Sequence, residues 1–333
     1  MKKRYSFLVT IIIIGLLVYA LKGIDFYEIW NLLKKVDGYY FALAFLCALG
    51  SFLLWNLRWM NTLEGIVNVN YWFLLKVLFA GVFLNNITPG TGIGGEPARA
   101  YFLSKKYNKP KTKMFGVILA EKMFNLSIFL LFVLISLLSV LILVEIPRSL
   151  KIFFESAVLV IFVLIILFLL IPRRKKSNRE WLLRKLFILK SINKNFKNFN
   201  EFKLYVRRRI SNLKGAFSKS VRGKKKLYRG LLFSAGFWML TFFVSYFLFL
   251  SFNVKINFLS VIIAVSLSNF IGDISPLPGG IGMMEGTMFL LYSSMGIPDS
   301  LAIIVTLLSR FIYYFFALFV GGISLLYLRF SVK

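Results

Sequence analysis

Two short Pro-Gly segments interrupt the apolar stretches of this chain and constrain its fold more than any other feature. Residues 89–96 read PGTGIGGE and residues 278–285 read PGGIGMME, so each runs from Pro-Gly to a glutamate. Pro and Gly break helices, and a carboxylate is costly in hydrocarbon. Broken backbone at membrane depth is tolerated only where protein or a wet cavity surrounds it. Two such breaks, one in each half, indicate the binding site of a transporter.

The composition places the chain in a membrane. It is 59% hydrophobic and 17% aromatic, and its mean hydropathy of +0.77 exceeds that of soluble domains of this length. One cysteine, Cys47, and no histidine exclude a disulfide within the chain, a Cys/His zinc site and a histidine base. An ion held by carboxylates stays open, but we expect no cofactor and no bound metal.

Six segments are apolar for about the 20 residues that a spanning helix needs. They are 5–22, 39–57, 114–143, 152–171, 230–252 and 300–328. The first follows three basic residues and lacks a small-residue cleavage site, so we interpret it as a retained helix and not a signal peptide. The sequence therefore predicts a single all-α polytopic membrane domain over residues 1–333, in the cell membrane.

The loop charges predict the orientation. Basic residues without matching acids gather at the N-terminus, at 105–113, at 172–229 and at the C-terminus, whereas 22–38 and 144–156 are charge-balanced. By the positive-inside rule the basic segments are cytoplasmic, and both termini then lie in the cytoplasm.

This orientation leaves two segments that enter and leave on the same side. Residues 74–104 are predicted to form a re-entrant hairpin from the cytoplasm with its tip near Pro89, and 258–296 one from outside with its tip near Pro278. Two oppositely oriented hairpins suggest an inverted repeat. The alternative is two unrelated loops rich in Gly and Pro, which are common in membrane helices.

The loop 172–229 is strongly basic. It holds 21 Lys and Arg against Glu180 and Glu201, a net charge of +19, out of +29 for the whole chain. In a membrane protein this favours contact with anionic lipid, and we expect no nucleic-acid partner. An apolar stripe at spacings of three and four predicts an amphipathic helix in the headgroup layer: Phe199, Phe202, Val206, Ile210, Leu213 and Phe217. It either gathers lipid headgroups or is only an anchored connector.

Eight ionisable residues lie in or beside apolar segments: Arg58, Glu96, Arg99, Glu121, Lys122, Asp273, Glu285 and Arg310. Each costs about 2.5–3.5 kcal/mol at the centre of the bilayer if it faces lipid, so we expect them to face inward and pair. Glu96 and Arg99 are three residues apart, on one helical face.

The same positions predict an anion site. The glycine turns should leave backbone N–H groups free at helix N-termini, and such groups attract a phosphate. The glycines expected to contribute are Gly90, Gly94, Gly95, Gly279 and Gly280. Arg58, Arg99 and Arg310 would complete a phosphate clamp. Glu96 and Glu285 would hold the arginines or carry a coupled proton. The alternative is that these charges only cap helices or form structural salt bridges.

Four strings, IGGEPARAYFLSKK, ILAEKMFNL, ISPLPGGIGMMEG and LLSRFIYYFFALFVGG, resemble the signature segments of the lysylphosphatidylglycerol synthase transmembrane region family, also called flippase-like membrane proteins. The resemblance spans nearly the whole chain. It implies functional charges at Arg58, Glu96, Arg99, Glu121, Lys122, Glu285 and Arg310, although Lys122 stands where arginine is more usual. It also implies a stand-alone transporter unit, since the soluble domain that makes the lipid in the best-known members is not present here.

We therefore expect a translocase that moves a phospholipid or an isoprenoid-phosphate-linked headgroup between leaflets, with an anionic membrane lipid or lipid-linked phosphate as its partner. We expect no enzymatic activity. Two alternatives are a membrane enzyme that acts on lipid-linked phosphate, with Glu96 or Glu285 as base, and a scaffold without transport that recruits a partner through 172–229.

Overall fold

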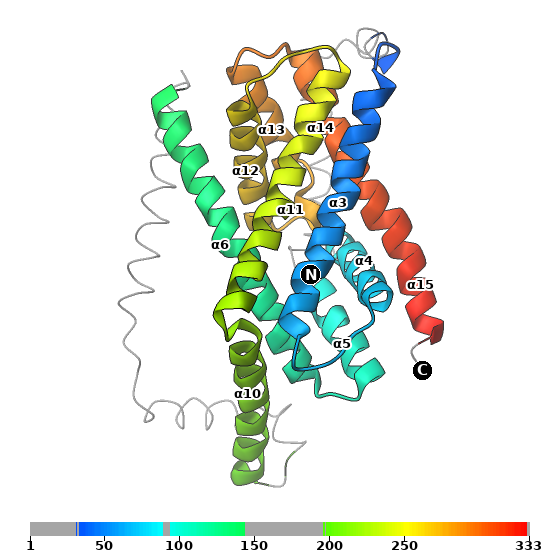
Figure 1. The fold of residues 1–333 in the computed structure, drawn as a ribbon, viewed down its shortest axis with the longest axis vertical. Helices are drawn as coiled ribbons and strands as arrows, with labels where there is room; N and C mark the ends of the chain where they lie inside the picture. The colour runs from blue at the N-terminus through cyan, green and yellow to red at the C-terminus, as the bar shows by residue number, and fades with distance from the viewer. Residues whose placement is uncertain (1–30, 32, 89–93, 144–195, 197, 332–333) are drawn as a thin grey trace, which may run out of the picture.

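In the computed structural model of this chain, the described residues are 31, 33–88, 94–143, 196 and 198–331. Their regular structure is helical throughout (Figure 1). Four segments are long and apolar enough to cross a membrane: α3 (Gly38–Leu63), α6 (Lys111–Leu143), α11 (Lys224–Ser251) and the continuous run Asp299–Ser331. These confirm four of the six predicted spans. The other two, 5–22 and 152–171, lie outside the described residues.

The run Asp299–Ser331 contains an irregularity that the sequence did not reveal. It consists of α14 (Asp299–Tyr314), a π-helical segment η2 (Phe315–Val320) and α15 (Gly321–Ser331). A π segment shifts the helical register, so the side chains of α14 and α15 face directions that a continuous α-helix would not give them.

Each predicted hairpin is a pair of short helices joined by a break. The first is α4 (Tyr71–Ile87) with α5 (Gly95–Tyr107), and the second is α12 (Phe258–Ile274) with α13 (Met283–Ser294), with a 3-10 turn η1 (Pro278–Gly280) between the latter two. Pro89 and Gly90, at the expected tip of the first hairpin, lie outside the described residues. In Figure 1, α4 and α5 occupy the lower half of the molecule and α12 and α13 the upper half.

The two halves repeat the order long, short, short, long. The helices of the first unit (α3, α4, α5, α6) have 26, 17, 13 and 33 residues, and those of the second (α11, α12, α13, then α14 to α15) have 28, 17, 12 and 33. The units run in opposite directions: Asp37 N donates to Ser251 O at 2.8 Å at one end, and Lys226 Nζ to Glu64 O at 2.7 Å at the other. The matching order of helix lengths and the antiparallel first helices agree with the predicted inverted repeat.

Local chemistry explains why the short helices begin and end where they do. Asn70 and Asn257 cap α4 and α12, each accepting from backbone N–H groups two or three residues ahead, which satisfies orphan donors of the first turn. Gly95 then allows α5 to lie directly on α4, because a side chain there would collide with the carbonyl oxygen of Gly81. The first hairpin therefore depends on two glycines in close contact.

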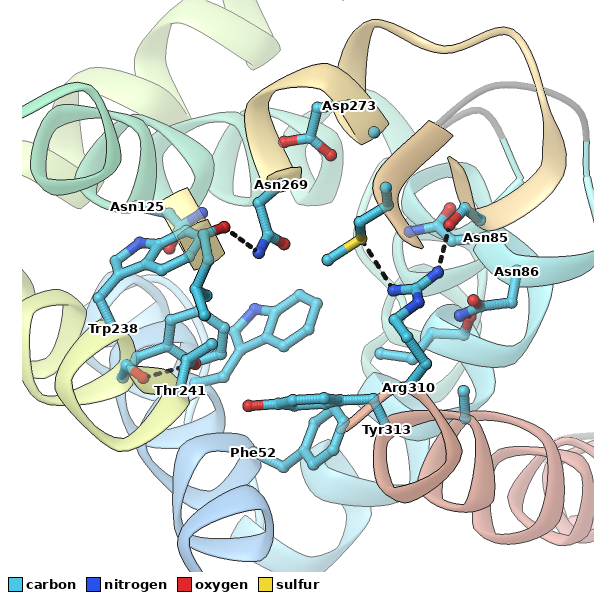
Figure 2. Close-up of a pocket in the computed structure, with 18 of the residues that line it drawn as sticks. Phe52, Asn85, Asn86, Asn125, Trp238, Thr241, Asn269, Asp273, Arg310 and Tyr313 are labelled. Atoms are coloured by element: carbon cyan, nitrogen blue, oxygen red, sulfur yellow. Dashed lines mark hydrogen bonds between the residues drawn. The ribbon is translucent and has the colours of Figure 1, made fainter. Parts of the chain in front are cut away.

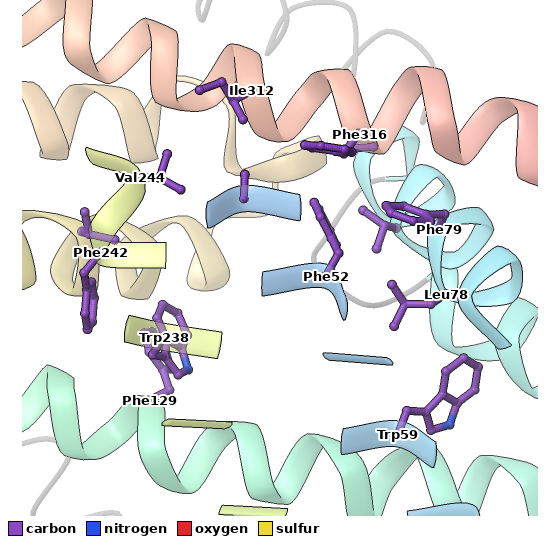
Figure 3. Close-up of a cluster of buried hydrophobic side chains, with 14 of the residues drawn as sticks. Phe52, Trp59, Leu78, Phe79, Phe129, Trp238, Phe242, Val244, Ile312 and Phe316 are labelled. Carbon is purple, nitrogen blue, oxygen red and sulfur yellow. The ribbon is translucent and has the colours of Figure 1, made fainter. Parts of the chain in front are cut away.

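An aromatic core holds the repeats together (Figure 3). Phe52 of α3 packs against Phe79 of α4 and Phe316 of η2, with ring centroids 5.1 and 5.4 Å apart. On the other side of α3 and α11, Phe129 of α6 stacks on Trp238 of α11 at 4.7 Å. Aromatic side chains bury large areas and restrict the geometry of their neighbours, so they fix the walls around the centre of the molecule.

The basic loop contains the predicted helix, α10 (Phe199–Val221), but its placement differs from the prediction. It runs along the long axis of the bundle (Figure 1). A helix in the headgroup layer would instead lie across that axis. Its apolar stripe covers α6: Phe202 is buried, and Leu213 lies so close to Gly116 that a side chain on that glycine would meet its backbone. Part of the stripe therefore packs on protein, whereas Ile210 is 48% exposed. In addition, α11 begins at Lys224, six residues before the predicted start at 230, so the last residues of the predicted loop are helical.

The helix ends separate into two groups, as the charge pattern predicted. The C-terminal ends of α3, α5 and α15 lie at one end of the molecule with α10 and the start of α11, and the start of α12 lies at the other (Figure 1). Which end faces the cytoplasm stays a prediction of the positive-inside rule.

We predict that Lys109→Cys and Lys255→Cys, each in a Cys47→Ser background, react with a membrane-impermeant thiol reagent from opposite sides of sealed vesicles. Both lysines are exposed, one after α5 and one before α12. Lys109 should react from the cytoplasmic side. Labelling of both positions from the same side would contradict the arrangement.

We predict that Gly95→Ala lowers the free energy of unfolding by about 1–3 kcal/mol, the usual cost of forcing an extra methyl into a packed contact. Gly215→Ala is the matched control, because a side chain at Gly215 of α10 meets no atom within 4 Å; alanine there should stabilise the helix slightly. Thermal unfolding in detergent checks both. Equal midpoints for the two variants would show that the close contact of α4 with α5 is not required.

Candidate functional site

The last turn of α4 meets the turn η1 of the second hairpin beside a cavity of about 330 Å³. A side chain built on Gly279 of η1 would lie 2.8 Å from Asn86 Oδ1 of α4, so these two segments are in contact. Figure 2 shows the side chains that surround the cavity: Phe52 and Tyr313 form one wall, Trp238 and Thr241 another, and Arg310, Asn85 and Asn86 a third. The walls thus come from both repeats.

Three predicted residues form one buried ion cluster. Arg58 of α3 donates from Nε and Nη2 to the same oxygen of Glu121 of α6, at 2.7 Å each. Arg99 of α5 approaches the second oxygen at 3.3 Å, and its guanidinium lies 3.8 Å from the centre of the Trp59 ring. All three charged side chains are at most 2% exposed. One carboxylate therefore holds two guanidinium groups, which leaves the cluster with a net charge of +1.

The second pair faces the cavity. Glu96, in the first turn of α5, accepts from Lys122 of α6 at 2.8 Å. Its side chain is 5% exposed, whereas that of Lys122 is 46% exposed, so the ammonium is the most accessible cation of the site. The other oxygen of Glu96 is buried without a hydrogen-bond partner among the described residues.

The third pair lies at the second hairpin. Arg310 of α14 donates from Nε to Glu285 of α13 at 2.6 Å, and from Nη2 to Gly279 O and Tyr314 Oη at 2.8 Å each. Glu285 in turn accepts from the backbone N–H of Gly282 at 2.6 Å. The arginine thus ties α14 to the broken backbone of the hairpin.

The turn at Gly279–Gly282 does not offer the free donors that we predicted. The N–H groups of Gly280, Ile281 and Gly282 donate to Leu277 O, Pro278 O and Glu285 Oε2 respectively. This expectation was wrong because the turn closes on itself as a 3-10 helix and the glutamate caps the next helix. Gly279 contributes a carbonyl instead, and Gly280 lets the turn approach Gly272 of α12.

The first turn is similar in the part that the structure describes. The N–H of Gly95 donates to Asn85 Oδ1 at 2.6 Å, and Gly94 packs on Thr88. The described glycines Gly94, Gly95 and Gly280 thus serve close packing, and side chains are left as the polar groups of the cavity.

The sequence analysis did not assign four lining residues, the carboxamides Asn85, Asn86, Asn125 and Asn269 (Figure 2). Asp273, which was counted among the intramembrane charges but not placed in the anion site, lines the cavity at the end of α12. Asn125 Oδ1 accepts from Arg58 at 2.9 Å. Asparagines inside apolar helices are themselves a signal, because a polar group in hydrocarbon needs a partner.

The eight charges in and around the cavity balance, with Arg58, Arg99, Lys122 and Arg310 against Glu96, Glu121, Asp273 and Glu285. Arg99 and Glu285 do not line the cavity themselves but pair with Glu121 and Arg310, which do. Each of the four cations contacts a carboxylate. An anion that enters the cavity must therefore share a cation with a carboxylate or displace it. Lys122 and the +1 cluster at Glu121 are the groups best placed to accept it.

Comparison with known proteins agrees with this architecture. The family model for the lysylphosphatidylglycerol synthase TM region matches residues 6–321, and the chain belongs to this family of multi-pass membrane proteins. A UPF0104 membrane protein of Pyrococcus horikoshii is 27% identical over 328 residues, 97% of each chain, and one of Methanothermobacter thermautotrophicus is 25% identical over 312 residues, 92% of this chain and 90% of the other. A phosphatidylglycerol lysyltransferase of Staphylococcus aureus is 32% identical over 95 residues, 28% of this chain and 11% of the relative.

We predict that Glu121→Gln lowers the free energy of unfolding by about 3–5 kcal/mol, because it leaves two buried guanidinium groups without their counter-charge. Glu64→Gln is the matched control: Glu64 pairs with Arg229 at 2.8 Å, but the side chains are 54% and 37% exposed. Such a pair contributes about 0–1 kcal/mol. Thermal unfolding of the purified protein measures both, and similar losses for the two variants would contradict the buried cluster.

Proposed function

We propose that this protein moves a lipid between the two leaflets of the membrane, with the phosphate-bearing headgroup passing through the central cavity. The observation that carries the proposal is the cavity itself: it holds ion pairs and carboxamides at the meeting point of two hairpins from opposite ends. A headgroup in hydrocarbon needs polar partners throughout its passage, and these side chains supply them.

The charges of the cavity favour a phosphate-bearing headgroup. The Lys122 ammonium is accessible, and the cluster of Arg58, Arg99 and Glu121 has one more cation than anion. A phosphate would gain charge-assisted hydrogen bonds there. Because each cation already contacts a carboxylate, the phosphate would take the place of that carboxylate on the cation. When the headgroup departs, the ion pair forms again, so no cation is left without a counter-charge.

The inverted repeat supplies a route to both sides. Each hairpin places a glutamate in the first turn of its second helix, and each glutamate pairs with a cation 25 or 26 residues later: Glu96 with Lys122, and Glu285 with Arg310. The first pair is accessible through Lys122, whereas Arg310 and Glu285 are 13% and 15% exposed. If the repeats exchanged conformations, the second pair would become the accessible one, and the cavity would open to the other side.

A membrane enzyme that acts on lipid-linked phosphate is the competing proposal, and reconstitution separates the two. An enzyme consumes its substrate in detergent micelles, where there are no leaflets, whereas a translocase changes only the location of the lipid. A scaffold would tolerate loss of the buried charges but not loss of the cations of α10.

We predict that Arg310→Lys and Arg99→Lys slow lipid movement by at least about tenfold, since lysine keeps the charge but loses the planar fork of donors, and charge-assisted hydrogen bonds are each worth about 1.5–3 kcal/mol. Glu96→Gln and Glu285→Gln should also stop movement, because they release Lys122 and Arg310.

The assay uses proteoliposomes with a fluorescent phospholipid and an impermeant quencher that reaches only the outer leaflet. Arg329→Lys is the matched control, because Arg329 is exposed in the last turn of α15. Variants that fold normally and move lipid at the rate of the unmodified protein would show that the charges are structural and that the route lies elsewhere.

A further inference from the structure

A second cavity, of about 630 Å³, lies where α3 ends and α11 begins. Apolar side chains line it from the spanning part of both helices, including Leu57, Met60 and Phe233. Toward the helix ends, polar side chains (Asn61, Glu64, Asn68 and Arg229) line it together with the apolar Leu63, Ile66, Val67 and Val69. The lining is therefore amphiphilic, and its polar side chains lie at the basic end of the molecule.

Two buried polar atoms of this lining have no hydrogen-bond partner in the part of the chain that the structure describes: the side-chain oxygen of Asn61 and Nε of Arg229. Asn61 is 6% exposed, and its amide nitrogen donates to Lys226 O at 2.9 Å. Arg229 donates from Nη2 to Glu64 at 2.8 Å. Each side chain is thus oriented by one hydrogen bond, and a second polar atom of the same side chain has no hydrogen-bond partner among the described residues. Buried groups of this kind are normally satisfied, and a ligand that reached both would supply an acceptor for Arg229 and a donor for Asn61.

The surroundings are cationic. Arg222, Lys224 and Lys225, a few residues before Arg229 in the chain, are exposed, and Glu64 is the acid of the lining. Lys226 caps the end of α3 by donating to Glu64 O. An anionic group is attracted to this end of the molecule, and the helix ends lie where the headgroups of a bilayer begin.

We propose that this cavity is a binding site for an anionic phospholipid of the leaflet at the basic end, distinct from the central cavity. The phosphate accepts from Arg229, a headgroup hydroxyl donates to the Asn61 side-chain oxygen, and an acyl chain lies against Leu57, Met60 and Phe233. A membrane lipid fits better than a soluble anion because only an amphiphile matches both the apolar and the polar part of the lining. The site joins the first helices of the two repeats, so a bound lipid stabilises their junction.

The test is native mass spectrometry of the full chain in detergent, titrated with phosphatidylglycerol or with phosphatidylcholine of the same acyl chains. Phosphatidylglycerol carries hydroxyl donors and a net negative charge, whereas the choline headgroup has no donor. We expect one phosphatidylglycerol to bind about tenfold more tightly than phosphatidylcholine, as expected for one charge-assisted hydrogen bond. Bound phosphatidylglycerol should also raise the unfolding temperature.

Two pairs of variants locate the site. Arg229→Gln should weaken the binding of phosphatidylglycerol about tenfold, whereas Lys225→Gln, which removes the same charge one helical turn away and outside the lining, should not. Phe233→Trp should fill the cavity and reduce binding, whereas Leu232→Trp, on the neighbouring exposed residue, should not. Equal effects within either pair, or equal affinities for the two lipids, would overturn the proposal in favour of a diffuse basic surface. Lipid movement through the central cavity is not part of this readout, so the two proposals fail separately.

Discussion

The buried cluster of Arg58, Arg99 and Glu121 is the interaction on which the rest of the structure depends. Three ionised side chains from α3, α5 and α6 lie within a hydrocarbon-spanning region and are almost fully excluded from solvent. Removing charges from water costs several kcal/mol per ion, and only close pairing offsets that cost. The three helices must therefore meet at one place, and this fixes the first hairpin against the long helices of its repeat.

The second hairpin solves the same problem in a different way. Its broken backbone at Gly279 needs a donor, and Arg310 supplies it while pairing with Glu285. The first half uses a carboxylate shared by two arginines and a separate Glu96–Lys122 pair, and the second half uses one arginine for both backbone and carboxylate. The repeats are thus alike in backbone but not in charge, and the cavity between them has an accessible cation on one side only.

The site was predicted in part, and the successes and errors have one physical origin. Charged residues in apolar segments were expected to face inward and pair, because hydrocarbon leaves no other partner. Seven of the eight form the ion pairs described above, but the side chains of Lys122 and Asp273 are exposed. The expectation of free N–H donors at Gly280 and Gly282 was wrong, because both N–H groups donate to acceptors within the turn and the helix that follows it. The stripe of α10 was assigned to lipid because its apolar pattern is the same whether it covers a membrane or, as found, the helix α6.

The sequence by itself determined the order of long and short helices, the two breaks and the separation of basic from neutral ends. Hydropathy, helix breaking by Pro and Gly, and loop charge are local properties that need no knowledge of neighbours. Only the tertiary structure decided which carboxylate holds which cation, because the partners are far apart in the chain: Arg58 and Glu121 are separated by 63 residues, and Arg58 and Ser234 by 176. Both cavities likewise arise from packing between the two repeats, which no local pattern specifies.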